Sequence, residues 1–182
     1  MKTSRENGHS IRVLFDDAVI AERVAQMAGE IAAARLDNLL VIPILKGSFM
    51  FAADLLRALH RASVKLEVDF LSLSSYRAGT VSSGQVEIVR DVESQVDGRN
   101  VVLIDDILES GRTLAFAKDL MAARGAASVN TCVLLNKPGK RATDLEAEFV
   151  GFECPDLFVV GYGMDMAHSF RELPYVGVID QS

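Results

Sequence analysis

The sequence is poor in the residues that build metal and redox centres. Its 182 residues include only two cysteines and three histidines. Cys132 and Cys154 lack the spacing of a zinc site or a redox pair, and the histidines form no i, i+4 pair of ligands. These shortages argue against a disulfide scaffold and a histidine–cysteine metal centre. We expect two lone, buried thiols.

Long apolar runs and excess positive charge are also missing. The longest unbroken apolar stretch, LLVIPIL at residues 39–45, is far shorter than the roughly 20 residues of a membrane helix. The first ten residues, MKTSRENGHS, have no apolar core of a signal peptide. We therefore expect a cytoplasmic protein. The net charge of −6 argues against a nucleic-acid partner, whereas an anionic substrate could still be held by backbone amides or a metal ion.

The composition is that of one ordinary globular domain. Apolar residues make up 49% of the chain and charged residues 24%, and no repeat or linker divides it. We therefore expect a single domain over residues 1–182.

Apolar segments that alternate with helical patterns indicate an α/β fold. Helices are predicted over residues 16–35, 49–62 and 113–126, and strands over 38–45, 64–73, 86–93, 100–106, 128–135, 157–163 and 175–180. This alternation predicts a doubly wound, mainly parallel sheet with helices on both faces. In such folds ligands bind beyond the carboxyl ends of the strands. The segments KGS, DDILESGRT, NKPG and GYGMD follow predicted strands and are expected to line one cleft.

The segment VVLIDDILESGRTL, residues 101–114, contains the strongest chemical signal. Asp105 and Asp106 end a predicted strand, where paired carboxylates can hold Mg²⁺, ribose hydroxyls or both. Residues 109–113 can form a turn whose backbone N–H groups converge at a helix N-terminus, with Gly111 permitting close approach. This unit fits a sugar phosphate. The chain contains neither the G-x-x-x-x-G-K-[ST] loop of P-loop proteins nor the G-x-G-x-x-G of dinucleotide-binding folds.

This segment resembles the phosphoribosyl pyrophosphate (PRPP) loop of type I phosphoribosyltransferases. Further stretches, LKGS, SSYRAGTVSSG, LLNKPGKR, FVGFECPDLFVVGYGMD and SFRELPYVGVI, resemble the hypoxanthine-guanine branch of that family. The match runs over residues 39–179. It implies a small purine-binding hood built from segments near both termini, with close packing into a homodimer or homotetramer.

The resemblance implies residues that bind PRPP. Lys46 and Gly47 would form the pyrophosphate loop, where the family often has a non-proline cis bond, and Arg171 would add a cation there. Asp105 and Asp106 would face the ribose hydroxyls and Mg²⁺. The loop that wraps the 5′-phosphate would consist of Glu109, Ser110, Gly111, Arg112 and Thr113.

It also implies residues around the base. Lys137 would donate to the purine O6, Phe158 would stack on the ring, and Val159 would read the base edge through its backbone. Asp165 would help to hold a second Mg²⁺. A lid would be formed by Ser75 and Tyr76, in the polar stretch 74–85, and would keep water away from the ribosyl cation of the reaction.

The implied reaction is purine salvage, in which hypoxanthine or guanine and PRPP give IMP or GMP and pyrophosphate. A lysine opposite O6 makes adenine a poor substrate. The chain departs from the family at two positions, with Glu109 in place of the usual aspartate general acid/base and Asp105 in place of the usual glutamate. Two other functions stay open: a xanthine-preferring enzyme, and a regulator that keeps the PRPP fold but binds RNA.

Overall fold

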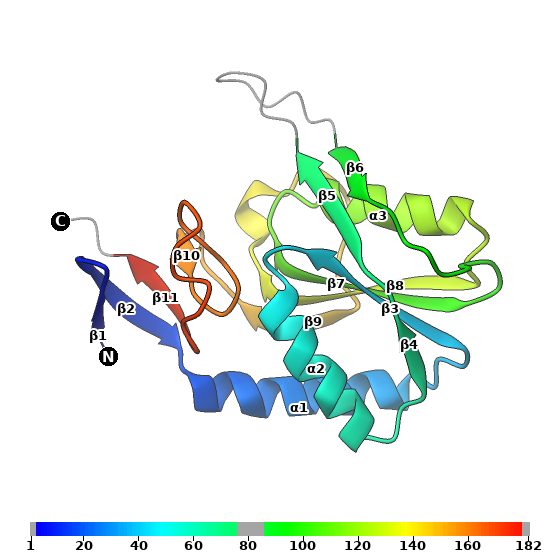
Figure 1. Cartoon of the computed structure of the whole chain (residues 1–182), viewed down its shortest axis with the longest axis horizontal. Helices are drawn as coiled ribbons and strands as arrows, with labels where there is room; N and C mark the ends of the chain where they lie inside the picture. The colour runs from blue at the N-terminus through cyan, green and yellow to red at the C-terminus, as the bar shows by residue number, and fades with distance from the viewer. Residues whose placement is uncertain (1–2, 76–85, 180–182) are drawn as a thin grey trace.

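The computed structural model describes residues 3–75 and 86–179 and arranges them in two sheets (Figure 1). The elements in chain order are β1 (Thr3–Glu6), β2 (His9–Phe15), α1 (Asp17–Ala33), β3 (Leu39–Leu45), α2 (Phe49–Arg61), β4 (Leu66–Val68), β5 (Leu71–Ser75), β6 (Val86–Arg90), β7 (Asn100–Leu108), α3 (Arg112–Ala123), β8 (Ser128–Asn136), the 3-10 helix η1 (Pro138–Lys140), β9 (Phe149–Glu153), β10 (Val159–Val160) and β11 (Val176–Ile179).

The larger sheet has the order β6-β5-β3-β7-β8-β9, and β4 also pairs with β3. All its pairings are parallel except that of β5 with β6. Neighbouring residues of β3 face opposite sides: Val41 lies in one core with residues of α1 and α2, and Leu40 lies in another with residues of α3. The predicted doubly wound α/β architecture is therefore confirmed.

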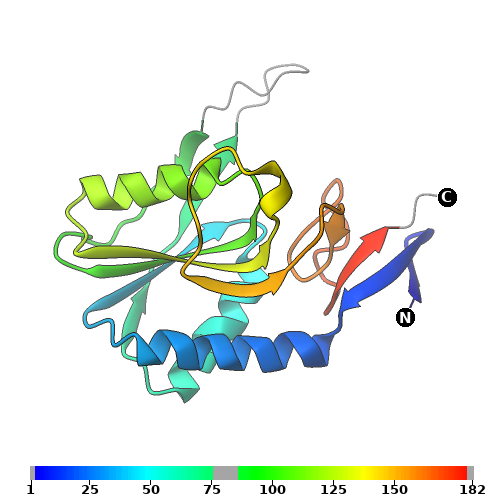
Figure 2. The same cartoon turned by 180° about the vertical axis from the view of Figure 1, so that it is seen from behind.

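Helix α1 connects the two sheets (Figure 2). The Asp16 carboxylate caps it by accepting a hydrogen bond of 3.0 Å from the Val19 N–H, which satisfies a backbone donor of the first turn. Its apolar stripe, which includes Ile20 and Met27, is buried against the larger sheet. None of the helices in the described residues is long and apolar enough to cross a membrane.

A smaller antiparallel sheet joins the two ends of the chain. Its order is β1-β2-β11-β10, and its core includes Ile11, Val160 and Phe170. The family resemblance implies a hood from segments near both termini, and the role of this sheet as a purine-binding hood stays a prediction. The strand predicted over residues 157–163 is wrong in extent and place, because only Val159–Val160 forms a strand and it pairs with β11 in the smaller sheet.

Two other strand predictions need correction, and one strand was missed. The strand predicted over residues 64–73 is interrupted between β4 and β5, where the Asp69 carboxylate accepts backbone hydrogen bonds from Phe70, Glu93 and Ser94. Strand β7 does not end at Asp106 but continues to Leu108. Strand β9 was not predicted, since its residues are only partly buried and lack a clear apolar pattern.

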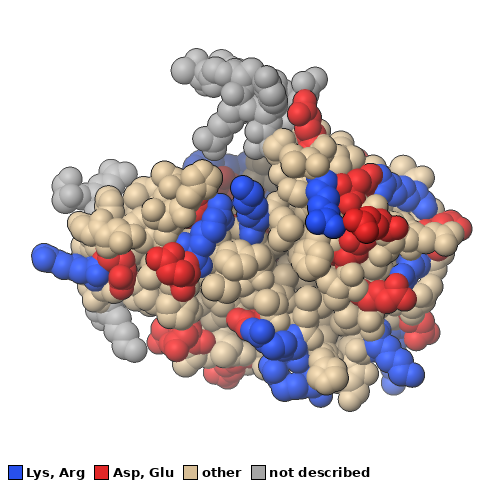
Figure 3. Space-filling model, viewed as in Figure 1, with Lys and Arg blue, Asp and Glu red and all other residues tan. Residues whose placement is uncertain are grey.

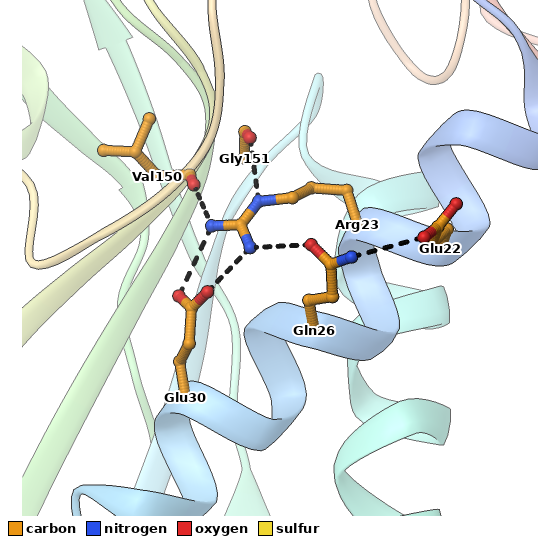
Figure 4. Close-up of polar contacts among 6 residues, drawn as sticks. All are labelled: Glu22, Arg23, Gln26, Glu30, Val150 and Gly151. Carbon is orange, nitrogen blue, oxygen red and sulfur yellow. Dashed lines mark hydrogen bonds and ion pairs between the residues drawn. The ribbon is translucent and has the colours of Figure 1, made fainter.

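The outer edge of the larger sheet is held by one arginine of α1 (Figure 4). Arg23 donates to the carbonyl oxygens of Val150 and Gly151 in β9, at 2.7 and 2.9 Å. Its guanidinium also pairs with Glu30 at 2.6 Å. The charged donors thus satisfy edge carbonyls and fasten the helix to the strand.

We predict that Arg23→Met lowers the free energy of unfolding by about 1.5–3 kcal/mol, because hydrogen bonds from a charged donor to the β9 carbonyls are lost. Urea unfolding followed by circular dichroism would measure this. Arg61→Met, at an exposed position of α2, is the matched control and should change the value by less than about 0.5 kcal/mol. Equal effects of the two substitutions would contradict a special role for Arg23.

Candidate active site

The four polar segments predicted to converge do lie around one cavity. It has a volume of about 1030 Å³ and is lined by residues of all four, including Lys46, Asp106, Lys137 and Asp165. It opens where β3, β7 and β8 end, and residues 156–171 close its other side. A smaller cavity of about 200 Å³ is lined by residues 105, 107–111, 113 and 114.

The smaller cavity is a cradle at the start of α3. Gly111 is the N-cap residue and has a φ of +81°, a conformation that favours glycine. A Cβ at this position would lie 2.3 Å from Thr143 Oγ1, so glycine is also required by space. Ser110 and Thr113 belong to the lining, whereas Arg112 is exposed and lines neither cavity. The helix N-terminus and the backbone amides suit a phosphate.

The paired acids lie between the two cavities. Asp105 is buried and Asp106 is partly buried, and the Asp106 N–H donates to Asp105 Oδ1 at 3.0 Å. Loss of hydration, together with repulsion from Asp106, raises the pKa of Asp105 well above its ordinary value. Burial likewise raises the pKa of Asp106. Two adjacent carboxylates with raised pKa values are candidates for binding a cation or hydroxyl groups.

The pyrophosphate loop implied by the resemblance packs directly against these acids. The Leu45–Lys46 peptide bond is cis, as expected for the family. A Cβ on Gly47 would come within 1.8 Å of Asp106 Oδ2, and one on Gly163 within 2.2 Å of the Gly47 carbonyl oxygen. Glycine at both positions therefore lets three backbone segments meet at the cavity.

Asp165 stands apart from the paired acids. Its carboxylate accepts from Arg171 at 2.8 Å and from the His168 N–H at 2.7 Å. Among the described residues, no group of three histidine, cysteine or acidic side chains could hold a metal ion. The expected metal ligands, Asp105, Asp106 and Asp165, therefore do not form one protein cage. An ion at the acid pair would complete its shell with substrate oxygens or water, as Mg²⁺ commonly does.

One side of the larger cavity is built around Lys137. This lysine is only 5% exposed, its Nζ donates to the Leu157 carbonyl oxygen at 2.6 Å, and it lies 3.9 Å from Glu109 Oε1. Phe158 is 60% exposed and lines the same cavity with Val159. An apolar ring and a buried donor thus face one space, which suits a planar, polar-edged ligand.

Two further charged residues were missed by the sequence analysis. Lys140 Nζ lies 2.8 Å from Asp156 Oδ1 and 3.9 Å from Glu109 Oε1, and both residues line the larger cavity. They belong to segments that the resemblance covers, but only the fold shows that they pair. Of the two predicted lid residues, Ser75 ends β5 and Tyr76 lies outside the described residues.

Comparisons with known proteins agree with this geometry. A family model described as a phosphoribosyl transferase domain matches residues 14–167. The chain is 43% identical over 169 residues to the hypoxanthine-guanine phosphoribosyltransferase of Bacillus subtilis, covering 92% of each chain. A hypoxanthine phosphoribosyltransferase structure from Staphylococcus aureus is 37% identical, with a TM-score of 0.87 over 93% of this chain and 91% of that one. One from Trypanosoma cruzi is 34% identical, with a TM-score of 0.90 over 97% and 95%.

The raised pKa of Asp105 predicts that Asp105→Asn stabilises the protein at pH 8 when no divalent cation is present. The folded state holds the Asp105 proton more tightly than the unfolded chain, so the stability from this proton is present below about pH 4 and is lost as the pH rises through the folded-state pKa. We expect the variant to have a higher free energy of unfolding than the wild type at pH 8, because the wild type must then bury the charge of Asp105 in the folded state.

Urea unfolding at pH 4 and pH 8 would test this, and the advantage of Asp105→Asn should shrink at pH 4. Asp91→Asn is a control of opposite sign, because the hydrogen bond from Arg124 lowers the pKa of Asp91. That variant should lose stability at pH 8. A destabilised Asp105→Asn protein at pH 8 would contradict the unfavourable burial of the acid pair.

Proposed function

This chain belongs to the phosphoribosyl transferase family, and we propose that it transfers the 5-phosphoribosyl group of PRPP to N9 of hypoxanthine or guanine. The products are IMP or GMP and pyrophosphate. The observation that carries the proposal is the joining of three features at one site: the buried acid pair, the cradle at the start of α3, and the buried Lys137 facing Phe158. Each feature fits one part of the two substrates.

We assign PRPP to the side of the site formed by β3 and β7. Its 5′-phosphate would bind residues 109–113, and its ribose hydroxyls would face Asp105 and Asp106. The pyrophosphate would contact Lys46, the Gly47 amide and Arg171. Arg171 donates to the Gly163 carbonyl oxygen at 2.6 Å, which keeps its charge beside Asp165 and at the edge of the cavity.

Mg²⁺ is the proposed cofactor, because carboxylate oxygens are the ligands it prefers and the acid pair offers them without a competing lysine or arginine salt bridge among the described residues. When bound, it would neutralise charge on pyrophosphate. Asp165 is a proposed ligand for a second ion, and to serve as one its carboxylate would have to exchange its contact with Arg171.

The protein groups have distinct tasks at the reacting centre. Bond breaking at the anomeric carbon leaves positive charge on the ribose and negative charge on pyrophosphate. Lys46 and Arg171 would stabilise the leaving group, and Glu109 would exchange a proton with the purine near N7. Lys137 and Lys140 each lie 3.9 Å from Glu109 Oε1, so these two cations would hold the glutamate, which is longer than the usual aspartate, beside a bound base.

The base pocket is proposed to select 6-oxopurines. Lys137 can only donate, so it would pair with a 6-oxo group and would oppose the donor protons of a 6-amino group. Phe158 would stack on the ring, and the backbone of Val159 would contact the 2-position edge. A xanthine preference would have to arise from that same edge.

We also propose the setting in which the enzyme works. The unpaired thiols Cys132 and Cys154 are consistent with the cytoplasm. A homodimer or homotetramer is supported by the exposed apolar side chain of Ile88 on the outer strand β6. The smaller sheet would serve as a purine-binding hood, and Ser75 and Tyr76 would close over the bound substrates.

RNA binding is the alternative that the surface disfavours. The net charge is −6, and the face in Figure 3 shows acidic and basic side chains interspersed. A continuous basic field, the usual footprint of a nucleic-acid partner, is not seen on that face within the described residues.

The activity test is product formation from PRPP and Mg²⁺ with hypoxanthine, guanine, xanthine and adenine in parallel. We expect turnover of hypoxanthine and guanine, and adenine slower by at least about 100-fold, because a donor would face a donor. Faster turnover of xanthine than of either would support the xanthine-preferring alternative. No turnover of any base, together with a salt-dependent RNA gel shift, would support the regulator instead.

Lys137→Met should raise the KM for hypoxanthine by about 10-fold or more and leave the KM for PRPP within about twofold, since a charged hydrogen bond is worth roughly 1.5–3 kcal/mol. Steady-state kinetics with each substrate varied would show this difference. Lys118→Met is the control: it removes a lysine of α3 that pairs with Glu148, and it should leave both KM values unchanged. An unchanged hypoxanthine KM in Lys137→Met would contradict the base assignment.

A further inference from the structure

The phosphate cradle is held from behind by the segment that follows β8. Three consecutive carbonyl oxygens of the cradle accept one hydrogen bond each from this segment. Leu108 accepts from the Lys137 N–H at 2.9 Å, Ser110 accepts from the Ala142 N–H at 2.8 Å, and Glu109 accepts from Arg141 Nη1 at 3.1 Å. Of the three donors, only that of Arg141, which binds the Glu109 carbonyl oxygen, belongs to a side chain.

These contacts fix the direction of the amide groups that face the cavity. In a planar trans peptide the carbonyl and the next N–H point in opposite directions. Turning the Glu109 carbonyl back toward Arg141 therefore turns the Ser110 N–H forward, and the Ser110 carbonyl does the same for the Gly111 N–H. Neither of these two N–H groups has a hydrogen-bond partner within the described residues. Successive free amides of this kind form an anion-binding nest.

Arg141 is itself locked in place. Its side chain is 12% exposed, and Nη2 donates to Asn136 Oδ1 at 2.6 Å. The Asn136 amide in turn donates to both carboxylate oxygens of Glu153, at 2.9 and 3.1 Å. A chain of polar contacts thus runs from the end of β9 through the end of β8 to the Glu109 carbonyl.

From this geometry we infer that Arg141 is a positioning residue for the 5′-phosphate of PRPP. It acts through the Glu109 carbonyl, which sets the Ser110 amide toward the phosphate, and it does not touch the substrate. The inference rests on the proposed function. Arg141 lies outside both cavity linings. Its removal should weaken the binding of PRPP more than the binding of the purine base.

The test combines Arg141→Ala and Arg141→Lys with a matched control. Arg99 is an equally buried arginine, 11% exposed, that also donates to backbone carbonyls, those of Asn38 and Leu39. It lies at the opposite end of the strands, where β3 and β7 begin. Arg99→Ala should therefore cost comparable stability without affecting phosphate binding.

We expect Arg141→Ala to raise the KM for PRPP at least about tenfold, with the KM for hypoxanthine within about twofold of the wild type. The lysine of Arg141→Lys can reach Glu109 but cannot also bind Asn136 in the same way. Its KM for PRPP should therefore lie between those of the wild type and Arg141→Ala. Ethylguanidinium should restore part of the PRPP affinity of Arg141→Ala, whereas ethylammonium should restore less. Arg99→Ala should keep both KM values and respond to neither additive.

Calorimetric binding of PRPP with Mg²⁺ gives a second readout that needs no turnover. If the wild type binds PRPP but transfers it to no base, the proposed function fails, and the inference is judged on binding alone. If Arg141→Ala is too unstable to purify, Arg141→Lys carries the test. PRPP affinities of the Arg141 variants within twofold of Arg99→Ala, or equal rescue by the two additives, would overturn the inference.

Discussion

The parallel pairing of β7 with β8 is the constraint on which the rest of the site depends. The register runs from Asn100↔Ser128 to Leu108↔Asn136, so both strands end together at the carboxyl edge of the sheet. The acids at 105 and 106 lie within β7, the phosphate cradle follows it, and Lys137 follows β8. A register shift would separate the cradle from the lysine, and no change in a single side chain could restore their relation.

The site makes demands on stability that the fold offsets elsewhere. Two adjacent carboxylates are kept in a partly dry environment, and their raised pKa values record that cost. The compensation comes from apolar strands buried on both faces and from charged side chains that hold the backbone, such as Arg23 at β9 and Arg99 at the start of β3. Substrate and metal would relieve the repulsion between the acids, so binding and folding are linked through the same residues.

The sequence allowed much of this arrangement to be predicted, because strongly apolar strands and capped helices are local features. The order of residues in DDILESGRT already pointed to a sugar phosphate. Strand β9 was missed, since its partly buried residues carry no clear apolar pattern. The reason for glycine at 151 is visible only in the fold, where a Cβ would lie 2.4 Å from the Leu134 carbonyl oxygen. The Lys140–Asp156 pair and the Arg141 contact were missed for a different reason. Both depend on where the chain returns after β8.

The measurement that tests the central claim most directly is the equilibrium binding of IMP, inosine and AMP to the wild-type protein. In the proposed function, one site recognises a phosphate through the cradle and a 6-oxo group through Lys137. IMP should therefore bind at least about tenfold more tightly than inosine, which lacks the phosphate, and than AMP, which has an amino group at position 6. Equal affinities for the three ligands would contradict the account.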